Sequence, residues 1–309
     1  MTDVILHHYP SSPFAEKIRL MLGYKKLVWK SVLIPSILPK PDVAALTGGY
    51  RRTPVLQIGA DVYCDTALIA DVLEHIEPFP ALYPVHSKGM ARTLSHWADT
   101  TLFWTAMAYN MQPAGRAELF ANAPPEAAAA FAEDRKAMSL GMMRLRAADA
   151  AGAYKSYLRR LSDMLESHPF LLGDAPCITD FSMFHPLWFT RTRTPVLGHI
   201  FDATPAVLQW MDRLANIGHG EFTKLTAEQA IAVAATAAPA ALKDEPFQDE
   251  HGIALGSRVT VGAETFGLEP TEGELLAATR MHYTLRRTDA RAGTVHVHFP
   301  RIGYQLKAA

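Results

Sequence analysis

Cysteine is scarce in this sequence, and its scarcity excludes a fold that depends on disulfide bonds. Only Cys64 and Cys177 are present among 309 residues. A disulfide framework needs several pairs, whereas free thiols are typical of proteins in a reducing compartment. We therefore expect a cytoplasmic protein.

The sequence also lacks an excess of either charge and any long apolar run. Thirty lysines and arginines balance 31 aspartates and glutamates, a formal net charge of −1. Nucleic-acid-binding proteins need a basic surface, so nucleic acid is not an expected partner. A membrane-spanning helix needs roughly 20 consecutive apolar residues, a length that no stretch reaches. The N-terminus has no basic segment before an apolar one, so we expect neither a membrane partner nor a signal peptide.

What the sequence does have is the composition of a globular protein with more than one domain. Hydrophobic residues make up 49% of the chain and charged residues 20%, which excludes a disordered or collagen-like chain. A chain of this length exceeds one ordinary core, so two or three domains are expected. Pro78, Pro80 and Pro84 mark the first expected linker.

Strand and helix signals alternate over the first eighty residues. Short apolar runs predict strands, and apolar positions at helical spacing predict helices. The expected strands lie at 4–6, 29–34, 55–58 and 62–64, and the expected helices begin near Pro13, Asp42 and Asp65. On the first helix, Glu16, Lys17 and Arg19 are expected to face solvent. The predicted order is β-α-β-α-β-β-α.

The rest of the chain divides into a helical part and a strand-rich part. Residues 88–242 show a helical pattern that no strand signal interrupts. After Lys243–Pro246, strand-like runs at 258–261, 274–286 and 294–299 are separated by glycines. Short strands in this arrangement predict a small antiparallel β-barrel-like module over 246–309. We expect it to be a separate unit tethered by Lys243–Pro246.

Three short motifs in the first domain resemble those of the glutathione S-transferase family. Tyr9–Arg19 resembles the turn before the first helix of serine-type members, with Ser-Pro-Phe at 12–14. Arg52–Leu56 resembles the family's cis-proline segment, and Tyr63–Ile69 resembles its acidic motif ahead of a helix. The three motifs follow one another at compatible spacing and are most similar to omega, tau and zeta members.

The resemblance implies an architecture, a cofactor and partners. It covers residues 1–80 by motif and 81–230 by helical character. It implies a thioredoxin-like glutathione-binding domain at 1–80 and an all-helical C-terminal domain at 88–242, an α/β plus α fold. The module at 246–309 lies outside the usual two-domain family. The resemblance implies a cytoplasmic homodimer that acts in detoxification. It also implies glutathione as the co-substrate and no metal ion.

Ser12 is the catalytic residue that the resemblance implies, because it stands immediately before Pro13. A hydroxyl at a helix N-terminus can donate to a thiolate, and the helix dipole also favours negative charge there. Together they would lower the pKa of the glutathione thiol from about 8.5 towards neutrality. Ser11 and Tyr9 are alternatives, and Ser12 could also be only a helix cap.

Other residues are implied to bind glutathione. Pro54 would turn the backbone of Val55 towards the cysteinyl part of the ligand, like an added strand. Asp65 and Thr66 would hold the γ-glutamyl ammonium and carboxylate, and Lys40 the glycyl carboxylate. The alternative interpretations are an ordinary edge-strand proline for Pro54, a simple helix cap for Asp65 and Thr66, and a solvated loop lysine for Lys40.

The second substrate is expected to bind in an apolar pocket built from the helical domain. Phe14, Phe103, Trp104 and Met107 are the candidates, and Trp97 and Tyr109 lie on the same aromatic-rich segment. Ordinary core packing is the alternative for each of these side chains. The residues do not identify the substrate.

Departures from the family pattern and weaker signals disfavour some functions and sites. Ser12 replaces the cysteine that glutaredoxin-like members need, which disfavours redox exchange. Cys177 takes the hydroxyl position of a capping box with Asp180, so a weaker cap is expected. His296 and His298 share a strand face near His282, and a solvated face is a better interpretation than a metal site.

The implied reaction is conjugation of the glutathione thiolate to an electrophilic, apolar substrate. A glutathione-dependent isomerase or dehalogenase would use the same thiolate. A non-catalytic glutathione-binding or regulatory protein would keep the same fold. Because no thiolate-stabilising residue lies in the module at 246–309, a chain ending near Lys243 is expected to bind glutathione.

Overall fold

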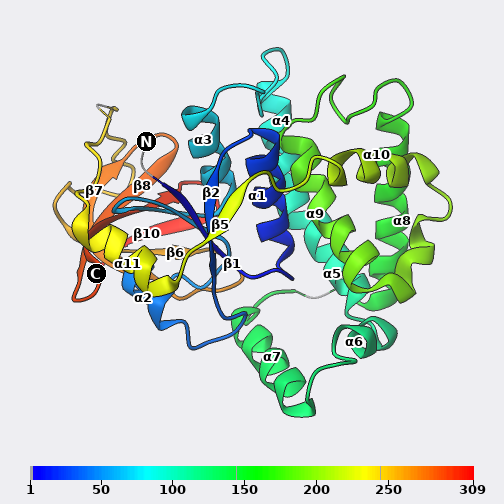
Figure 1. The fold of residues 1–309 in the computed structure, drawn as a ribbon, viewed down its shortest axis with the longest axis horizontal. Helices are drawn as coiled ribbons and strands as arrows, with labels where there is room; N and C mark the ends of the chain where they lie inside the picture. Colours follow the sequence, from blue (N-terminus) through cyan, green and yellow to red (C-terminus); the bar gives the residue numbers. More distant parts are fainter. Residues whose placement is uncertain (1–2, 144, 244) are drawn as a thin grey trace.

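The protein is described here by a computed structural model that covers residues 3–143, 145–243 and 245–309. A long mixed β-sheet forms one side of the molecule and a bundle of helices the other (Figure 1). In the described ranges, no helix is long and apolar enough to span a membrane.

The first 76 residues have the predicted order of elements. They are β1 (Val4–His8), α1 (Pro13–Tyr24), β2 (Trp29–Leu33), α2 (Pro41–Thr47), β3 (Val55–Ile58), β4 (Asp61–Cys64) and α3 (Thr66–Ile76). Strand β1 is buried along its whole length because it is central, with β2 parallel on one side and β3 antiparallel on the other. This is the thioredoxin-like domain that the motifs imply.

Helix α1 departs from the prediction in the face that it buries. Glu16, Lys17 and Arg19 are all buried, so the expectation that they face solvent is wrong. The helix packs against α9 (Ile178–Arg193) of the helical domain, and its charged side chains contact other parts of the chain: Arg19 lies 3.0 Å from His8, and Glu16 lies 3.0 Å from His219. Each charge has a partner: Arg19 pairs with Glu16, and Lys17 pairs with Asp99. Buried charges are tolerated only when they are paired in this way.

The all-helical domain is also present. It contains α4 (Lys88–Trp97), α5 (Phe103–Asn110), α6 (Pro113–Leu119), α7 (Pro125–Met138), α8 (Ala147–Met164), α9, η2 (Pro195–Phe201) and α10 (Pro205–Ala215). Helices α4 and α5 are joined without a break by a π-helical turn, η1 (Ala98–Leu102). The Cys177 cap of α9 keeps the capping-box arrangement, in which Asp180 accepts the Cys177 N–H at 2.9 Å.

After the bundle the chain returns to the sheet. Strand β5 (Phe222–Lys224), which interrupts the segment predicted to be helical throughout, pairs in parallel with β2. Helix α11 (Ala227–Thr236) then packs on α2 and β9. Gln57 in β3 donates to the carbonyl of Ala230 at 2.8 Å, which joins α11 to the sheet. A strand of three exposed residues has no apolar pattern by which the sequence could reveal it.

The C-terminal strands confirm an antiparallel β module, but the module does not stand apart. The strands are β6 (Arg258–Ala263), β7 (Thr271–Ala278), β8 (His282–Asp289), β9 (Gly293–Pro300) and β10 (Tyr304–Ala308). Strand β9 pairs in parallel with β4, so that one sheet runs in the order β10-β6-β7-β8-β9-β4-β3-β1-β2-β5. The expectation of a separate tethered unit is therefore corrected. Position 244 of the expected tether lies outside the described residues.

The pairing of β4 with β9 has a physical reason. An unpaired edge strand exposes backbone donors and acceptors, and β9 satisfies those of β4. Side chains strengthen the joint: His298 lies 2.9 Å from Asp61 Oδ1 and 3.0 Å from Thr284 Oγ1. His298 is buried, so the interpretation as a solvated strand face is wrong for this residue. Among the residues with described positions, no group of three or more His, Cys, Asp or Glu could hold a metal ion.

Candidate active site

Ser12 caps helix α1 and is almost fully buried, with 2% of its surface exposed. Its Oγ accepts the Ala15 N–H at 3.2 Å, and its own N–H donates to the Tyr9 carbonyl at 3.1 Å. Pro13 follows as the first helical residue, where its missing N–H costs nothing. Because Ser12 Oγ accepts the capping bond, its O–H proton remains available for a negatively charged ligand. The capping and donor interpretations are therefore compatible.

The alternative Tyr9 is engaged elsewhere. Its hydroxyl accepts a hydrogen bond from Arg135 of α7 at 3.3 Å, and the Lys40 ammonium lies 5.7 Å from the centre of its ring. Ser11 is half-buried in the turn before the helix. The choice among Ser12, Ser11 and Tyr9 stays a prediction.

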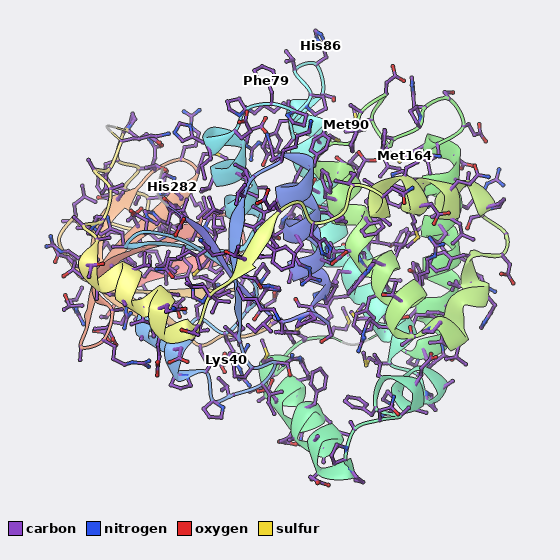
Figure 2. All side chains as sticks on the ribbon, in the orientation of Figure 1. Lys40, Phe79, His86, Met90, Met164 and His282 are labelled. Carbon is purple, nitrogen blue, oxygen red and sulfur yellow. The ribbon has the colours of Figure 1, made fainter. Side chains whose placement is uncertain are left out.

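The peptide bond between Thr53 and Pro54 is cis, as the resemblance implies. Lys40 lies next to this segment, because its Nζ donates to Thr53 Oγ1 at 3.3 Å. Figure 2 labels Lys40, the residue that precedes α2. Lys40 is buried, and burial, with a smaller effect of Arg135, lowers its pKa to about 8. The interpretation as a solvated loop lysine is therefore wrong, whereas a role towards the glycyl carboxylate stays a prediction.

Asp65 is held in an unusual backbone conformation at the start of α3. Its φ of +78° lies in the region that favours glycine, which costs on the order of 1–3 kcal/mol. Its Oδ1 accepts the Ala67 N–H at 2.9 Å, so the predicted cap is present. Its Oδ2 accepts the Tyr304 hydroxyl at 3.1 Å and lies 3.6 Å from Arg52 Nη1. These contacts hold the strained residue in place.

Thr66 belongs to a buried polar cluster that the sequence did not indicate. Lys17 Nζ donates to Thr66 Oγ1 at 3.1 Å and to Asp99 Oδ2 at 2.6 Å, and His185 lies 3.0 Å from Asp99 Oδ1. Because Thr66 Oγ1 accepts from Lys17, its hydroxyl proton can point towards a ligand. Helical periodicity places Lys17 on a polar face but cannot identify Asp99, which lies on η1 of another domain.

Charge pairing sets the protonation of this cluster. Burial alone would raise the pKa of Asp99, but Lys17 and His185 outweigh it and lower that pKa. Burial lowers the pKa of His185, so its imidazole is neutral and can donate to the carboxylate. The cluster therefore contains one ammonium and one carboxylate at neutral pH.

Aromatic candidates for the second-substrate pocket lie against one another, beginning with Phe14, two residues after Ser12. The ring centres of Phe14 and Phe103 are 4.6 Å apart, and those of Phe103 and Trp104 are 4.9 Å apart. The structure thus brings together three of the four side chains predicted to bind the second substrate. Phe103 and Met107 are buried members of one core cluster, and Phe14 and Trp104 pack against that cluster. Their role towards a substrate stays a prediction.

Two other aromatic candidates face the helical core. Trp97 packs against Tyr157 of α8 at 5.0 Å between ring centres. Tyr109 donates to the Leu197 carbonyl at 3.1 Å. Both therefore follow the core-packing interpretation.

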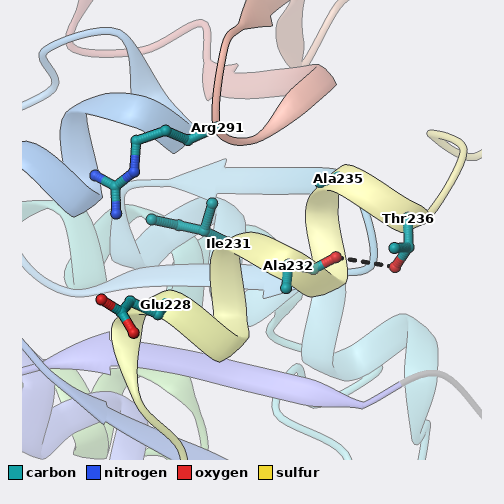
Figure 3. Close-up of a pocket in the computed structure, with 6 residues that line it drawn as sticks. All are labelled: Glu228, Ile231, Ala232, Ala235, Thr236 and Arg291. Carbon is teal, nitrogen blue, oxygen red and sulfur yellow. Dashed lines mark hydrogen bonds between the residues drawn. The ribbon is translucent and has the colours of Figure 1, made fainter.

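Two hollows on the surface are lined by residues other than these. One of about 390 Å³ lies on α11 beside Arg291, where Thr236 bonds back to the Ala232 carbonyl (Figure 3). A second, of about 280 Å³, is lined by Gly48, Arg258, Glu272, Arg287 and Thr288. Neither of these two hollows is lined by a predicted site residue.

The fold and site define a thioredoxin-like domain joined to a helical domain, with a buried hydroxyl that caps the first helix. Residues 6–81 match the glutathione S-transferase N-terminal domain, and residues 128–213 match the C-terminal domain. A solved GST-like protein from Pseudomonas syringae is 42% identical over 100% of both chains, with a TM-score of 0.84. The chain belongs to the glutathione S-transferase family, and its relative shares the C-terminal strands.

More distant structures share the fold alone. A tau class glutathione S-transferase from mango, Mangifera indica, is 16% identical over 69% of this chain and 88% of that chain, with a TM-score of 0.52. The β-etherase LigF from Sphingobium is 16% identical over 69% of this chain and 95% of that chain, with a TM-score of 0.51. No curated protein matches the chain.

Proposed function

We propose that the protein is a glutathione transferase that conjugates glutathione to an electrophilic, apolar substrate. The observation that supports this most is Ser12, a buried hydroxyl at the N-terminus of α1 whose oxygen accepts the Ala15 N–H. This arrangement leaves an O–H donor and the positive end of a helix dipole for a thiolate. Lowering the thiol pKa towards neutrality would supply the nucleophile at cytoplasmic pH.

The proposed reaction is a nucleophilic attack by sulfur. The thiolate electron pair forms a bond to an electrophilic carbon, and a leaving group such as halide departs with the electrons of its own bond. Asp65 and Thr66 hold the γ-glutamyl end, the backbone of Val55 the cysteinyl part, and Lys40 the glycyl carboxylate. Phe14, Phe103 and Trp104 border the electrophile.

Binding and turnover together test this proposal. We expect retention of the full-length protein on immobilised glutathione and a thioether product from an activated aryl halide. A product that lacks sulfur, with glutathione regenerated, would instead identify an isomerase or a hydrolytic dehalogenase. Retention without turnover across a broad panel of electrophiles would identify a binding or regulatory protein.

We also propose that the enzyme works in detoxification as a cytoplasmic homodimer. Exposed apolar side chains lie in the segment that joins α3 to α4 and at the start of α4: Phe79 is 77% exposed, Val85 87% and Met90 56%. Figure 2 labels Phe79 and Met90 on this side of the molecule. Exposed apolar groups in one place are typical of an association surface, and a two-fold dimer is the most common assembly. The buried free thiols of Cys64 and Cys177 fit a reducing compartment.

A further inference from the structure

Tyr304 connects the C-terminal module to the candidate glutathione site. It lies on β10, the strand at the end of the sheet, and its hydroxyl donates to Asp65 Oδ2 at 3.1 Å. The Tyr50 hydroxyl lies 2.9 Å from that of Tyr304. Since the proton of Tyr304 is directed to Asp65, Tyr50 donates to Tyr304. The result is a buried chain of hydrogen bonds that ends on the carboxylate.

Arg52 connects the same carboxylate to the loop between β6 and β7. Its guanidinium carbon lies 5.5 Å from the centre of the Tyr304 ring, and its Nη1 lies 3.6 Å from Asp65 Oδ2. On its other side, Nε donates to the Phe266 carbonyl at 2.8 Å. Arg52 stands just before Thr53-Pro54, so the loop is attached to the cis-proline segment itself.

The β6–β7 loop, residues 264–270, also reaches the helical domain. The Phe266 ring lies 4.9 Å from Trp104, and Gly267 donates to the Met138 carbonyl at 2.8 Å. Glu269 pairs with Arg51, which also pairs with Asp134 of α7 at 2.8 Å. The loop therefore lies across the border between the thioredoxin-like and helical domains.

Phe266 extends an aromatic row that begins with Phe14, two residues after Ser12. Neighbouring ring centres in the row are 4.6 to 4.9 Å apart, from Phe14 through Phe103 and Trp104 to Phe266. All three units of the chain contribute to this row. Ring edges and faces in such an arrangement favour a further aromatic ring over an aliphatic chain.

We propose that the C-terminal module forms a third wall of the active site. Tyr304 is a positioning residue that orients Asp65 towards the γ-glutamyl ammonium, and Phe266 favours aromatic electrophiles over aliphatic ones. The inference rests on the proposed transferase function. It qualifies the sequence-based expectation that a chain ending near Lys243 binds glutathione, because such a chain loses both side chains and should bind glutathione more weakly than the full chain does.

The role of Tyr304 is tested with Tyr304→Phe in the full-length protein. The ligands are glutathione and glutarylcysteinylglycine, which differs only in lacking the ammonium, and calorimetric competition gives both dissociation constants. We expect the variant to bind glutathione about tenfold more weakly, the scale of a lost hydrogen bond to a charged group, and the analogue as before. Tyr283→Phe is the control, since this ring contacts Arg301 and His251 instead.

The outcomes separate the two proposals. A wild-type protein that does not bind glutathione overturns both the function and the inference. If the wild type binds glutathione and Tyr304→Phe keeps the wild-type ratio of the two dissociation constants, only the role of Tyr304 is overturned. An equal loss for both ligands shows a general structural effect and also overturns it.

The role of Phe266 is tested by steady-state kinetics with Phe266→Ala. We expect KM for an aryl halide to rise about fivefold, while KM for an alkyl halide and the dissociation constant of glutathione stay unchanged. Leu268→Ala on the same loop is the control, because Leu268 is exposed. Equal changes for the two halides, or no change, overturn the role of Phe266 in specificity.

Discussion

Lys17 Nζ lies 2.6 Å from Asp99 Oδ2, although the two residues are 82 positions apart and belong to different domains. Lys17 is fully buried in its side chain, and Asp99 is 14% exposed. Lys17 also donates to Thr66, so this ion pair joins the interface between the domains to a predicted glutathione-binding residue. The contact between the domains and the predicted glutathione site therefore share one buried ammonium.

Removing one partner of this pair should strongly destabilise the protein. In Lys17→Met or Asp99→Asn a buried charge loses its partner, at a cost of about 3–5 kcal/mol in the free energy of unfolding. The double variant should lose much less than the sum of the two, because neither charge is then left unpaired. Urea unfolding measures all three, with the exposed Lys155→Met as control. Strictly additive losses would show that the pair is not coupled.

A second prediction concerns the pH dependence of stability. His7 lies 2.8 Å from Gln57, and burial lowers its pKa to about 4. The folded imidazole stays neutral, whereas the unfolded one takes up a proton near pH 6.5. The contribution to stability is therefore complete above pH 6.5 and decreases as pH falls towards 4, by about 2 kcal/mol at pH 5.

The variant His7→Gln isolates this contribution. It should lose less of its unfolding free energy between pH 7.5 and pH 5 than the wild type does, whatever its absolute stability. His168→Gln, at an exposed position, should keep the wild-type difference. An unchanged pH dependence in His7→Gln contradicts the prediction.

Replacing Ser12 should slow the reaction more than it weakens binding. Without the hydroxyl, the thiolate loses a donor, so Ser12→Ala should reduce turnover at pH 7 by roughly 10²-fold. The pH profile of kcat/KM should move to higher pH, and glutathione affinity should change little. Ser11→Ala is the matched control and should retain wild-type turnover. If Ser12→Ala is fully active, the catalytic role belongs to Ser11 or Tyr9.

Replacing Asp65 should affect binding more than stability. Asp65→Ala leaves the γ-glutamyl ammonium without a partner and should weaken glutathione binding by about 2–5 kcal/mol. Loss of the helix cap should lower the free energy of unfolding by about 1 kcal/mol, and loss of the acceptor for the Tyr304 hydroxyl by about 1 kcal/mol more. Calorimetry and thermal unfolding measure the two effects. The control is Asp71→Ala on the same helix, which loses its pair with Arg92 and should bind glutathione with wild-type affinity. If Asp65→Ala also binds glutathione with wild-type affinity, Asp65 is a helix cap only.

The proposed dimer gives a fifth prediction. Phe79→Ser combined with Val85→Ser should shift the protein to the mass of one chain in light scattering, because apolar contacts at the interface are lost. Ile302→Ser, at an apolar residue on the turn before β10 that is 72% exposed, should leave the mass unchanged. Equal masses for all three proteins would place the interface elsewhere or exclude a dimer.

Local motifs explain why the sequence predicted much of the fold and part of the site. The cap at Ser12, the cis bond before Pro54 and the cap at Asp65 each depend on a few neighbouring residues. Lys17 shows the limit of this approach. Its spacing predicts a solvent-facing position, which is wrong, because periodicity does not reveal that Asp99 of another domain pairs with Lys17.

The sequence by itself determined the family, the thioredoxin-like and helical parts, and the presence of C-terminal strands. The tertiary structure alone decided that β9 pairs with β4 and that Tyr304 reaches Asp65, 239 residues away in the chain. Alternation of apolar residues specifies which face of a strand is buried but not which distant strand lies beside it. The edge of β4 and the carboxylate of Asp65 are paired by residues that only the tertiary structure brings next to them.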